Sequence, residues 1–188
     1  MNLTSWAYTN RARPIPPLWL FTDTKRLPDP RPAVSLLPRG MAGVVFRHDD
    51  HPDRVRLGQD LARICRDRRL VLVVAGDTRL AVRLHAGVHL RGGRWPAAAR
   101  VRGFVTSSAH GRADLRRAAG AGARLAFLSP AFPTASHPGA PALGPARWCR
   151  LAQGAPLPVG ALGGVNGRTI RRLPARLCRA AAAISALM

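Results

Sequence analysis

The stretch AGVVFRHDDHPDRVRLGQDLARICRDRRLVLVVAGD, residues 42–77, decides the fold class of this chain. It holds two short apolar runs, Ala42–Arg47 and Leu70–Ala75, which are typical of buried strands. Between them, after Asp53 as a capping residue, lies a stripe of helical period formed by Leu57, Leu61, Ile64, Cys65 and Arg68. A strand, a helix and a second strand in this order predict parallel strands joined by a right-handed crossover.

The same alternation continues over most of the chain. Strands are expected at Leu18–Thr22, Ala42–Arg47, Leu70–Ala75, Gly87–Leu90, Val101–Val105, Leu125–Leu128, Pro158–Leu162 and Ala181–Ile184. Further helices are expected at Asp77–Leu84, Arg112–Ala121, Pro145–Leu151 and Asn166–Leu173. Eight strands that alternate with helices predict an α/β fold, a small (β/α)8 TIM barrel. Its first helix should be short or degenerate, because prolines break residues 27–40.

The length of the chain sets the number of domains. With 188 residues it can form one domain with a sizeable core. A (β/α)8 barrel usually has about 250 residues, so the helices must be short. Residues 1–17 are expected to be a poorly ordered lead-in, and residues 18–188 a single barrel domain. An open doubly wound sheet is disfavoured because no glycine-rich dinucleotide fingerprint follows the first strand.

The chain is strongly basic. Thirty Lys and Arg residues against nine Asp give a formal net charge of +21. Such a balance suits nucleic-acid binding or an anionic small substrate, because cationic side chains neutralise phosphates. The arginines are spread over nearly every segment instead of being concentrated in one arm, so nucleic acid is the less favoured partner.

Two further features concern the cellular compartment. No apolar run is long enough to cross a bilayer, and the first residues, MNLTSWAYTNRARP, lack the long apolar segment of a secretory signal. Cys65, Cys149 and Cys178 form no CxxC pair and are expected to be reduced thiols. The sequence therefore predicts a cytoplasmic protein without membrane contact, and leaves open whether it is a monomer or a homo-oligomer.

Polar and small residues follow the predicted strands, at the end where a barrel carries its active face. The segment Leu162-Gly163-Gly164-Val165-Asn166 ends the seventh strand with two glycines and a capping residue. Backbone N–H groups at such a place can bind a phosphate, since glycine allows a close approach. A plain turn is the alternative interpretation of these two glycines.

Two motifs resemble those of the thiamine phosphate synthase family and its TenI-like relatives. They are FLSPAFPTASHPGAPALG at 127–144 and PVGALGGVNGRT at 158–169. Shorter matches follow at the ends of the predicted strands, namely at 20–23, 44–47, 74–77, 87–90, 108–110 and 184–187. The resemblance implies a TIM barrel and a transferase of thiamine biosynthesis. It implies the coupling of hydroxymethylpyrimidine diphosphate with thiazole phosphate, in which a pyrimidine carbocation forms and pyrophosphate leaves.

Carried over by position, the resemblance also implies site residues. The diphosphate-binding and catalytic set is Arg47, Ser108, Thr134, Ser136 and His137. The thiazole-phosphate site is Gly163, Gly164, Ile184 and Ser185. Asp77 is expected to bind Mg²⁺, which would stabilise the charge that develops on the leaving diphosphate.

Four positions depart from the family pattern. Val45 stands where the family has Gln, Asp49 and His137 where it has Lys, and Arg94 where it has the second metal-binding Asp. Loss of one carboxylate weakens the Mg²⁺ site, although Arg94 can supply positive charge directly. His137 is cationic only below a reference pKa of about 6.5, unless a bound anion raises that pKa.

Three functions are compatible with these residues. The first is a thiamine phosphate synthase that uses Mg²⁺. The second is a TenI-like family member without synthase activity, which acts as a thiazole tautomerase or binds thiamine phosphate or thiazole phosphate. The tautomerase lacks its expected histidine, because Pro130 stands at that position. The third and least favoured is a basic nucleic-acid-binding protein.

Overall fold

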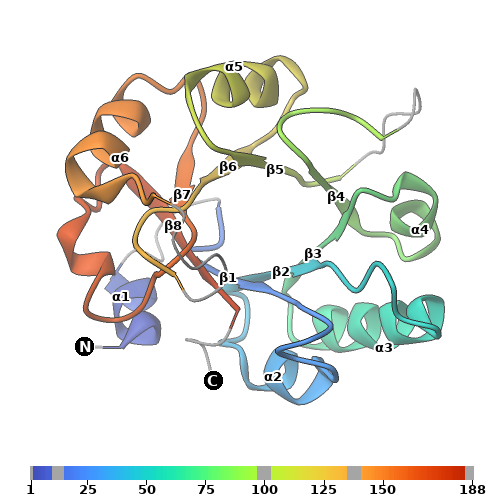
Figure 1. Cartoon of the computed structure of the whole chain (residues 1–188). Helices are drawn as coiled ribbons and strands as arrows, with labels where there is room; N and C mark the ends of the chain where they lie inside the picture. The colour runs from blue at the N-terminus through green and yellow to red at the C-terminus, as the bar shows by residue number, and fades with distance from the viewer. Residues whose placement is uncertain (1, 10–14, 97–102, 135–140, 185–188) are drawn as a thin grey trace.

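Eight parallel strands form a closed barrel, in the order in which they follow along the chain (Figure 1). The computed structural model describes residues 2–9, 15–96, 103–134 and 141–184. The strands are β1 (Leu18–Phe21), β2 (Ala42–Phe46), β3 (Val71–Ala75), β4 (Gly87–Leu90), β5 (Val105–Ala109), β6 (Leu125–Leu128), β7 (Val159–Ala161) and β8 (Cys178–Ala183). β8 closes the barrel on β1, with Leu18 beside Ala181. The predicted (β/α)8 barrel is confirmed.

Short helices surround the barrel (Figure 1). They are α2 (Arg31–Leu36), α3 (Arg54–Asp67), α4 (Thr78–Arg83), α5 (Arg112–Gly120), α6 (Gly144–Gln153) and the 3-10 helix η1 (Ile170–Arg172). The first crossover helix, α2, has only six residues and a proline in its first turn, as the prolines predicted. None of the described helices is long and apolar enough to span a bilayer.

Two apolar layers hold the barrel together. Inside it, Trp19 and Phe21 on β1 both pack edge-on against Phe127 of β6, with ring centroids 5.4 and 4.9 Å apart. A Cβ atom at Gly43 would lie 2.5 Å from the Trp19 ring, so this glycine makes room for the indole. The second layer lies between the outer faces of the strands and the helices. A barrel this small thus fills its interior with aromatic rings instead of leaving a pore.

The lead-in is partly helical. Residues Leu3–Thr9 form α1, which packs beside β1 and β8 (Figure 1). Its buried side chains are Leu3, Trp6 and Ala7. We expected poor order over 1–17, but these three apolar side chains at helical spacing give residues 3–9 a place on the outer layer of the core.

The predicted position of the fifth strand was wrong. β5 spans Val105–Ala109, whereas the apolar residues had indicated 101–105. The polar residues Thr106 and Ser107 are buried in the strand. Their hydroxyls have partners from neighbouring segments: Thr106 Oγ1 lies 2.9 Å from His89 Nδ1, and Ser107 Oγ accepts from Gly93 N over 2.9 Å. Tertiary hydrogen bonds thus allow polar residues inside the barrel.

Two boundaries near the C-terminus also differ from prediction. The helix expected over 166–173 is wrong, since only η1 forms there. The Asn166 side chain accepts hydrogen bonds from the backbone N–H groups of Arg168 and Thr169, which forms a turn that competes with a helix. β8 begins at Cys178, three residues before the predicted Ala181.

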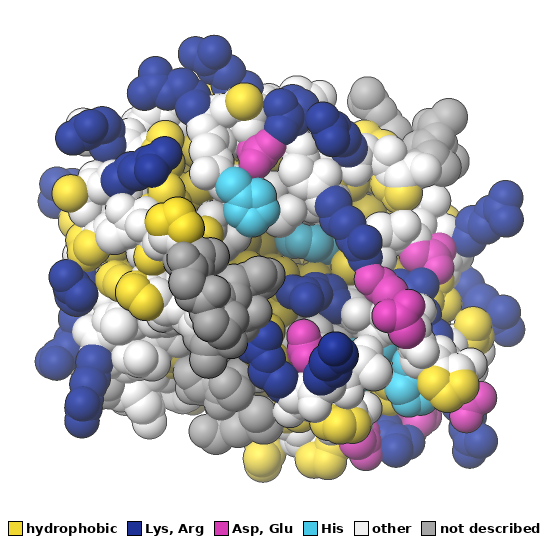
Figure 2. Space-filling model, viewed as in Figure 1, with side chains coloured by type: hydrophobic (Ala, Val, Ile, Leu, Met, Phe, Trp, Pro, Cys, Tyr) yellow, Lys and Arg dark blue, Asp and Glu magenta, His cyan; other side chains and the backbone are white. Residues whose placement is uncertain are grey.

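The surface carries the positive charge on many sides. Figure 2 shows Lys and Arg side chains around the whole visible face, whereas most of the visible Asp side chains gather on the right. Eight of the nine Asp residues lie at or before Asp77 in the sequence. The negative charge therefore belongs mainly to the β1–β4 half of the barrel.

Candidate active site

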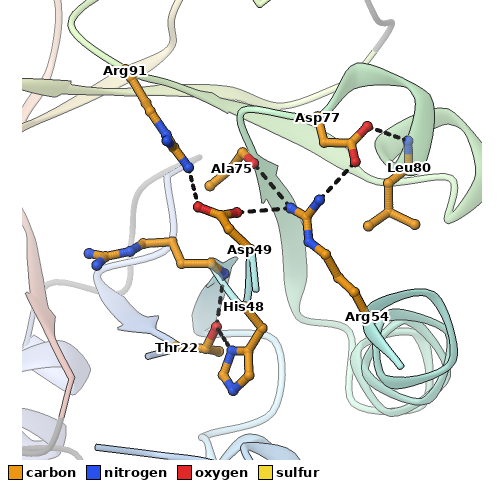
Figure 3. Close-up of polar contacts among 9 residues, drawn as sticks. Thr22, His48, Asp49, Arg54, Ala75, Asp77, Leu80 and Arg91 are labelled. Carbon is orange, nitrogen blue, oxygen red and sulfur yellow. Dashed lines mark hydrogen bonds and ion pairs between the residues drawn. The ribbon is translucent and has the colours of Figure 1, made fainter. Parts of the chain in front are cut away.

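A chain of four charged side chains lies at the carboxyl ends of β2, β3 and β4 (Figure 3). At its centre, Arg54 Nη1 donates to Asp77 Oδ2 over 2.8 Å, and Nη2 donates to Asp49 Oδ1 over 3.1 Å. The same Nη2 also donates to the carbonyl of Ala75 over 3.3 Å. Arg91 donates to the other oxygen of Asp49. The network therefore runs from Asp77 through Arg54 and Asp49 to Arg91.

The local fold fixes the two central members. Asp77 follows β3 as the N-cap of α4, and its Oδ1 accepts from Leu80 N over 2.9 Å. Arg54 is the first residue of α3, and its guanidinium lies over the Phe46 ring, 5.7 Å from the centroid. A parallel barrel brings both strand ends and the starts of the following helices to the same face, so these side chains meet.

A tight turn carries Arg91 and Arg94 over this face. The two residues form an isolated bridge, with Gly92 and Gly93 at φ +60 and +76 between them. The turn rests on β5, because Gly92 N donates to Ser108 Oγ over 3.0 Å and Gly93 N donates to Ser107 Oγ over 2.9 Å. Ser108, predicted as a polar substrate partner, thus supports the arginine-bearing turn.

A hollow of about 560 Å³ opens among these elements. It is lined by Asp49, Arg54, Ala75, Gly76, Asp77, Arg91, Arg94, Trp95 and Pro96. Three arginines against two aspartates leave a formal charge of +1. A Cβ atom at Gly76 would lie 3.3 Å from Arg91 Nε, so the glycine keeps this wall open for the guanidinium. The hollow has the size and charge to bind a small anionic molecule.

Arg47 directly follows β2 and pairs outside this network. Its Nη2 is 3.7 Å from Asp23 Oδ2, and its guanidinium lies 5.9 Å from the centroid of the Phe21 ring. The next residue, His48, is buried between Thr22 Oγ1 at 2.9 Å from Nδ1 and the Leu27 carbonyl at 3.0 Å from Nε2. Burial lowers the pKa of His48, so this ring supports the strand end as a neutral group.

His89 occupies the barrel interior. Its ring lies 5.4 Å from the Phe21 ring and 6.1 Å from the Phe127 ring, between centroids. Burial, with smaller effects of Arg47 and Arg91, lowers the pKa of His89 to about 3. The imidazole is therefore neutral at physiological pH and packs the interior. These contacts indicate a packing role for His89.

The opposite side of the barrel mouth is built from backbone. Gly163 and Gly164 follow β7 with φ +88 and +63. The Gly163 carbonyl accepts from Phe132 N over 3.0 Å, and a Cβ atom at Gly164 would lie 2.3 Å from the Pro133 carbonyl oxygen. Thr169 Oγ1 donates to the Gly164 carbonyl over 2.9 Å and closes the turn. The glycines are needed here for conformation and for close contact with the segment after β6.

The remaining predicted residues divide into two groups. Thr134 and Ile184 are described, and both are half-buried at the ends of the segments that follow β6 and β8. Ser136, His137 and Ser185 lie outside the described residues. The structure thus brings Asp77 and Arg94 together around the hollow, whereas Arg47 contacts Asp23 and Phe21. The predicted diphosphate set as a whole stays a prediction.

The side chains at the expected Mg²⁺ position do not fit the ion well. One oxygen of Asp77 caps α4 and the other pairs with Arg54, so both have partners. Mg²⁺ prefers free carboxylate and water oxygens in an octahedral arrangement. Within the described ranges, no group of three His, Cys, Asp or Glu side chains could hold a metal ion. Magnesium therefore stays a prediction, and this pairing does not favour it.

Three residues of the site were missed by the sequence interpretation: Arg54, Arg91 as an ion-pair partner, and Trp95. Trp95 lines the hollow, and its Nε1 donates to the Ala121 carbonyl over 3.2 Å. A signal for Arg54 did exist. A residue that begins the helix after a barrel strand lies at the carboxyl end of that strand, close to the aspartates that follow β2 and β3.

Comparison with known proteins gives a consistent result. The family model described as thiamine monophosphate synthase matches residues 20–187. A protein of Aquifex aeolicus (strain VF5), provisionally named thiamine-phosphate synthase 2, is 28% identical over 166 residues, which cover 84% of this chain and 89% of that protein.

Solved structures agree on the fold. A thiamine phosphate pyrophosphorylase from Pyrococcus furiosus superposes with a TM-score of 0.71 at 20% identity, covering 90% of this chain and 86% of that one. A thiamine phosphate pyrophosphorylase from Bacteroides thetaiotaomicron gives 0.62 at 15% identity, covering 90% and 83%. At these identities the likeness concerns the barrel alone.

Proposed function

This chain belongs to the thiamine monophosphate synthase family, and on that premise we propose that it couples hydroxymethylpyrimidine diphosphate with thiazole phosphate. The products are thiamine phosphate and pyrophosphate, so the protein is a transferase of thiamine biosynthesis. The observation that carries the proposal is the arginine-lined hollow at the carboxyl ends of β2–β4, the face on which barrel enzymes bind their substrates.

In the proposed reaction, the protein must above all stabilise the leaving diphosphate. The bond between the pyrimidine methylene carbon and the diphosphate oxygen breaks, and its electron pair stays on that oxygen. The thiazole nitrogen then forms the new bond to the carbon. Negative charge grows on the diphosphate, so donors that are already in place stabilise the transition state more than the ground state. Arg91 and Arg94 line the hollow and supply guanidinium donors that suit phosphate oxygens.

The hollow also offers an aromatic wall for the pyrimidine. Trp95 is half-buried, and the hydrogen bond from its Nε1 to the Ala121 carbonyl fixes the indole. An aromatic face can contact a flat heterocycle and stabilise a neighbouring cationic carbon. We assign the thiazole phosphate to the opposite side of the mouth, at Gly163 and Gly164, with Ile184 and Ser185 as further partners.

The direct test is formation of thiamine phosphate by the purified chain, measured by chromatography with Mg²⁺ and with a chelator. We expect product, and we expect Arg91→Gln to lower kcat/KM by about tenfold or more, since one charge-assisted phosphate contact is lost. Arg31→Gln is the matched control, because Arg31 pairs with Asp29 and Asp60 outside the hollow. A folded sample that forms no product in either condition would refute synthase activity.

One observation supports a second function. Both oxygens of Asp77 have protein partners, which does not favour the Mg²⁺-assisted reaction. A family member without synthase activity would bind thiazole phosphate or thiamine phosphate through the glycine turn and form no product. Calorimetry with thiamine phosphate, run beside the activity assay, separates the two: binding without turnover indicates the second function.

A further inference from the structure

We infer that the guanidinium of Arg54 takes the place of a divalent cation between Asp49 and Asp77, so that this hollow binds phosphate groups without a metal ion. The identity of the ligand as a diphosphate rests on the proposed function. The exclusion of the metal ion does not, because it concerns only this chain's own side chains.

The first argument is that one guanidinium pairs with both carboxylates. Asp49 Oδ1 and Asp77 Oδ2 accept from the two terminal nitrogens of one guanidinium, over 3.1 and 2.8 Å. The two carboxylates approach this one guanidinium from different sides, and it links them (Figure 3). Carboxylate oxygens are the protein ligands that divalent cations such as Mg²⁺ use. Here one monovalent cation of the chain itself already bridges them.

The second argument is that Arg54 is fixed in this place. Its side chain is only 18% exposed, and its guanidinium lies over the Phe46 ring. Nη2 has a second acceptor in the Ala75 carbonyl, while Nε is buried without a hydrogen-bond partner among the described residues. A metal ion that took the carboxylates would leave a largely buried guanidinium without its counter-ions, which is strongly unfavourable.

The third argument concerns what remains for an anion. Arg54 and Arg91 together neutralise Asp49 and Asp77, so these carboxylates no longer repel a phosphate group. Arg91 pairs with Asp49 through one nitrogen, and its side chain is 64% exposed. It and the exposed Arg94 can direct their other donors to phosphate oxygens. The positive charge that other sites obtain from a metal ion is therefore supplied by arginines.

The test is direct binding of Mn²⁺, used as a paramagnetic substitute for Mg²⁺, followed by electron paramagnetic resonance. Arg54→Gln shortens the side chain and removes its charge, which frees one oxygen of each carboxylate. We expect this variant to bind Mn²⁺ at least about tenfold more tightly than the wild type, whereas Arg54→Lys should not gain affinity. Arg63→Gln, on the exposed face of the same helix, is the matched control and should behave as the wild type.

Two measurements on the wild type keep the inference testable if Arg54→Gln does not fold. Calorimetry with inorganic pyrophosphate should give affinities within about twofold with Mg²⁺ and with a chelator, because the arginines bind it directly. Pyrophosphate binding that requires Mg²⁺, or tight Mn²⁺ binding by the wild type, would overturn the inference even if synthase activity is present. Conversely, absence of thiamine phosphate formation together with metal-independent pyrophosphate binding would refute the proposed function and leave the inference standing.

Discussion

The two sides of the barrel mouth are built from different groups, charged side chains on one side and backbone on the other. After β2, β3 and β4 the site consists of charged side chains, with Arg54 bridging Asp49 and Asp77. After β7 it consists of a backbone turn, in which Gly163 and Gly164 adopt positive φ and pack against the segment that follows β6. The first side depends on which side chains are present. The second depends on conformation and on space.

This difference explains which parts of the family pattern the chain keeps. A backbone turn tolerates many neighbouring substitutions as long as its glycines stay, and Gly163 and Gly164 are both present. A network of charges can exchange members, provided that each buried charge keeps a partner. Asp49 illustrates such an exchange: it stands where the family pattern has Lys, and it is paired with Arg54 and Arg91.

The largest expected effect lies on the backbone side, with Gly164→Ala. At φ +63, the new Cβ would lie 2.3 Å from the Pro133 carbonyl oxygen. Backbone strain and this overlap together should lower the free energy of unfolding by about 2–4 kcal/mol. Urea unfolding measures it. Thiazole-phosphate binding should be lost, while pyrophosphate binding persists on the other side.

Gly122→Ala is the matched control for that variant. Gly122 also has positive φ, +81, but a Cβ atom there would meet nothing within 4 Å. Gly122→Ala should therefore lose only about 1 kcal/mol of unfolding free energy, from the strain of the left-handed conformation. Equal losses for the two variants would mean that close packing is not what the backbone side requires, and the comparison between the two sides would fail.

Most of the fold could be predicted because barrel strands are nearly continuous apolar runs. β3 illustrates this: its residues Val71–Ala75 are almost all buried, as their side chains indicated. β5 could not be placed in this way, because it buries the polar residues Thr106 and Ser107. Their hydroxyls form hydrogen bonds with residues of β4 and of the turn after it. Periodicity detects apolar burial, and it does not detect polar burial that depends on distant partners.

The candidate site was less predictable, for a similar reason. Asp77 could be found because it directly follows a strand and begins a helix. Arg54 could be placed at the carboxyl end of β2 as the start of a helix, but its bridging role depends on two carboxylates that are 5 and 23 positions away in the chain. Among many arginines in a strongly basic sequence, only the folded geometry distinguishes the one that bridges two aspartates.

On the charged side, Asp77→Ala should have an intermediate effect. It removes the N-cap of α4 and one of the two carboxylates that balance Arg54. The loss of the cap accounts for about 1 kcal/mol, and we expect about 2 kcal/mol in total. Asp77→Asn keeps a capping oxygen and should lose about half as much. Thermal or urea unfolding measures both variants.

Asp60→Ala is the control for the charged side, because Asp60 pairs with Arg31 and Arg63 on the surface. Exposed pairs contribute little, so the change in unfolding free energy should stay within about 0.5 kcal/mol. If Asp77→Ala were no worse than Asp60→Ala, the Arg54 bridge would be no more than a surface ion pair.

The smallest expected effect concerns His89, which lies beneath both sides of the mouth. Burial lowers its pKa to about 3, whereas an unfolded chain has a histidine pKa near the reference of about 6.5. Between these two values the unfolded chain binds the proton and the folded barrel does not, so stability is lost as the pH falls from about 6.5 toward 3. His89→Gln removes the titration and keeps a polar group opposite Thr106.

Urea unfolding at pH 7 and pH 5.5 should therefore show a loss in the wild type that exceeds the loss in His89→Gln by about 1 kcal/mol. His48, whose pKa burial also lowers, is present in both proteins and contributes equally to each. Because the His89 ring contacts Phe21 on β1 and Phe127 on β6, its protonation should destabilise the barrel as a whole. Binding of pyrophosphate and of thiazole phosphate would then decline together at low pH. If only one declined, the two sides would differ in stability as well as in construction.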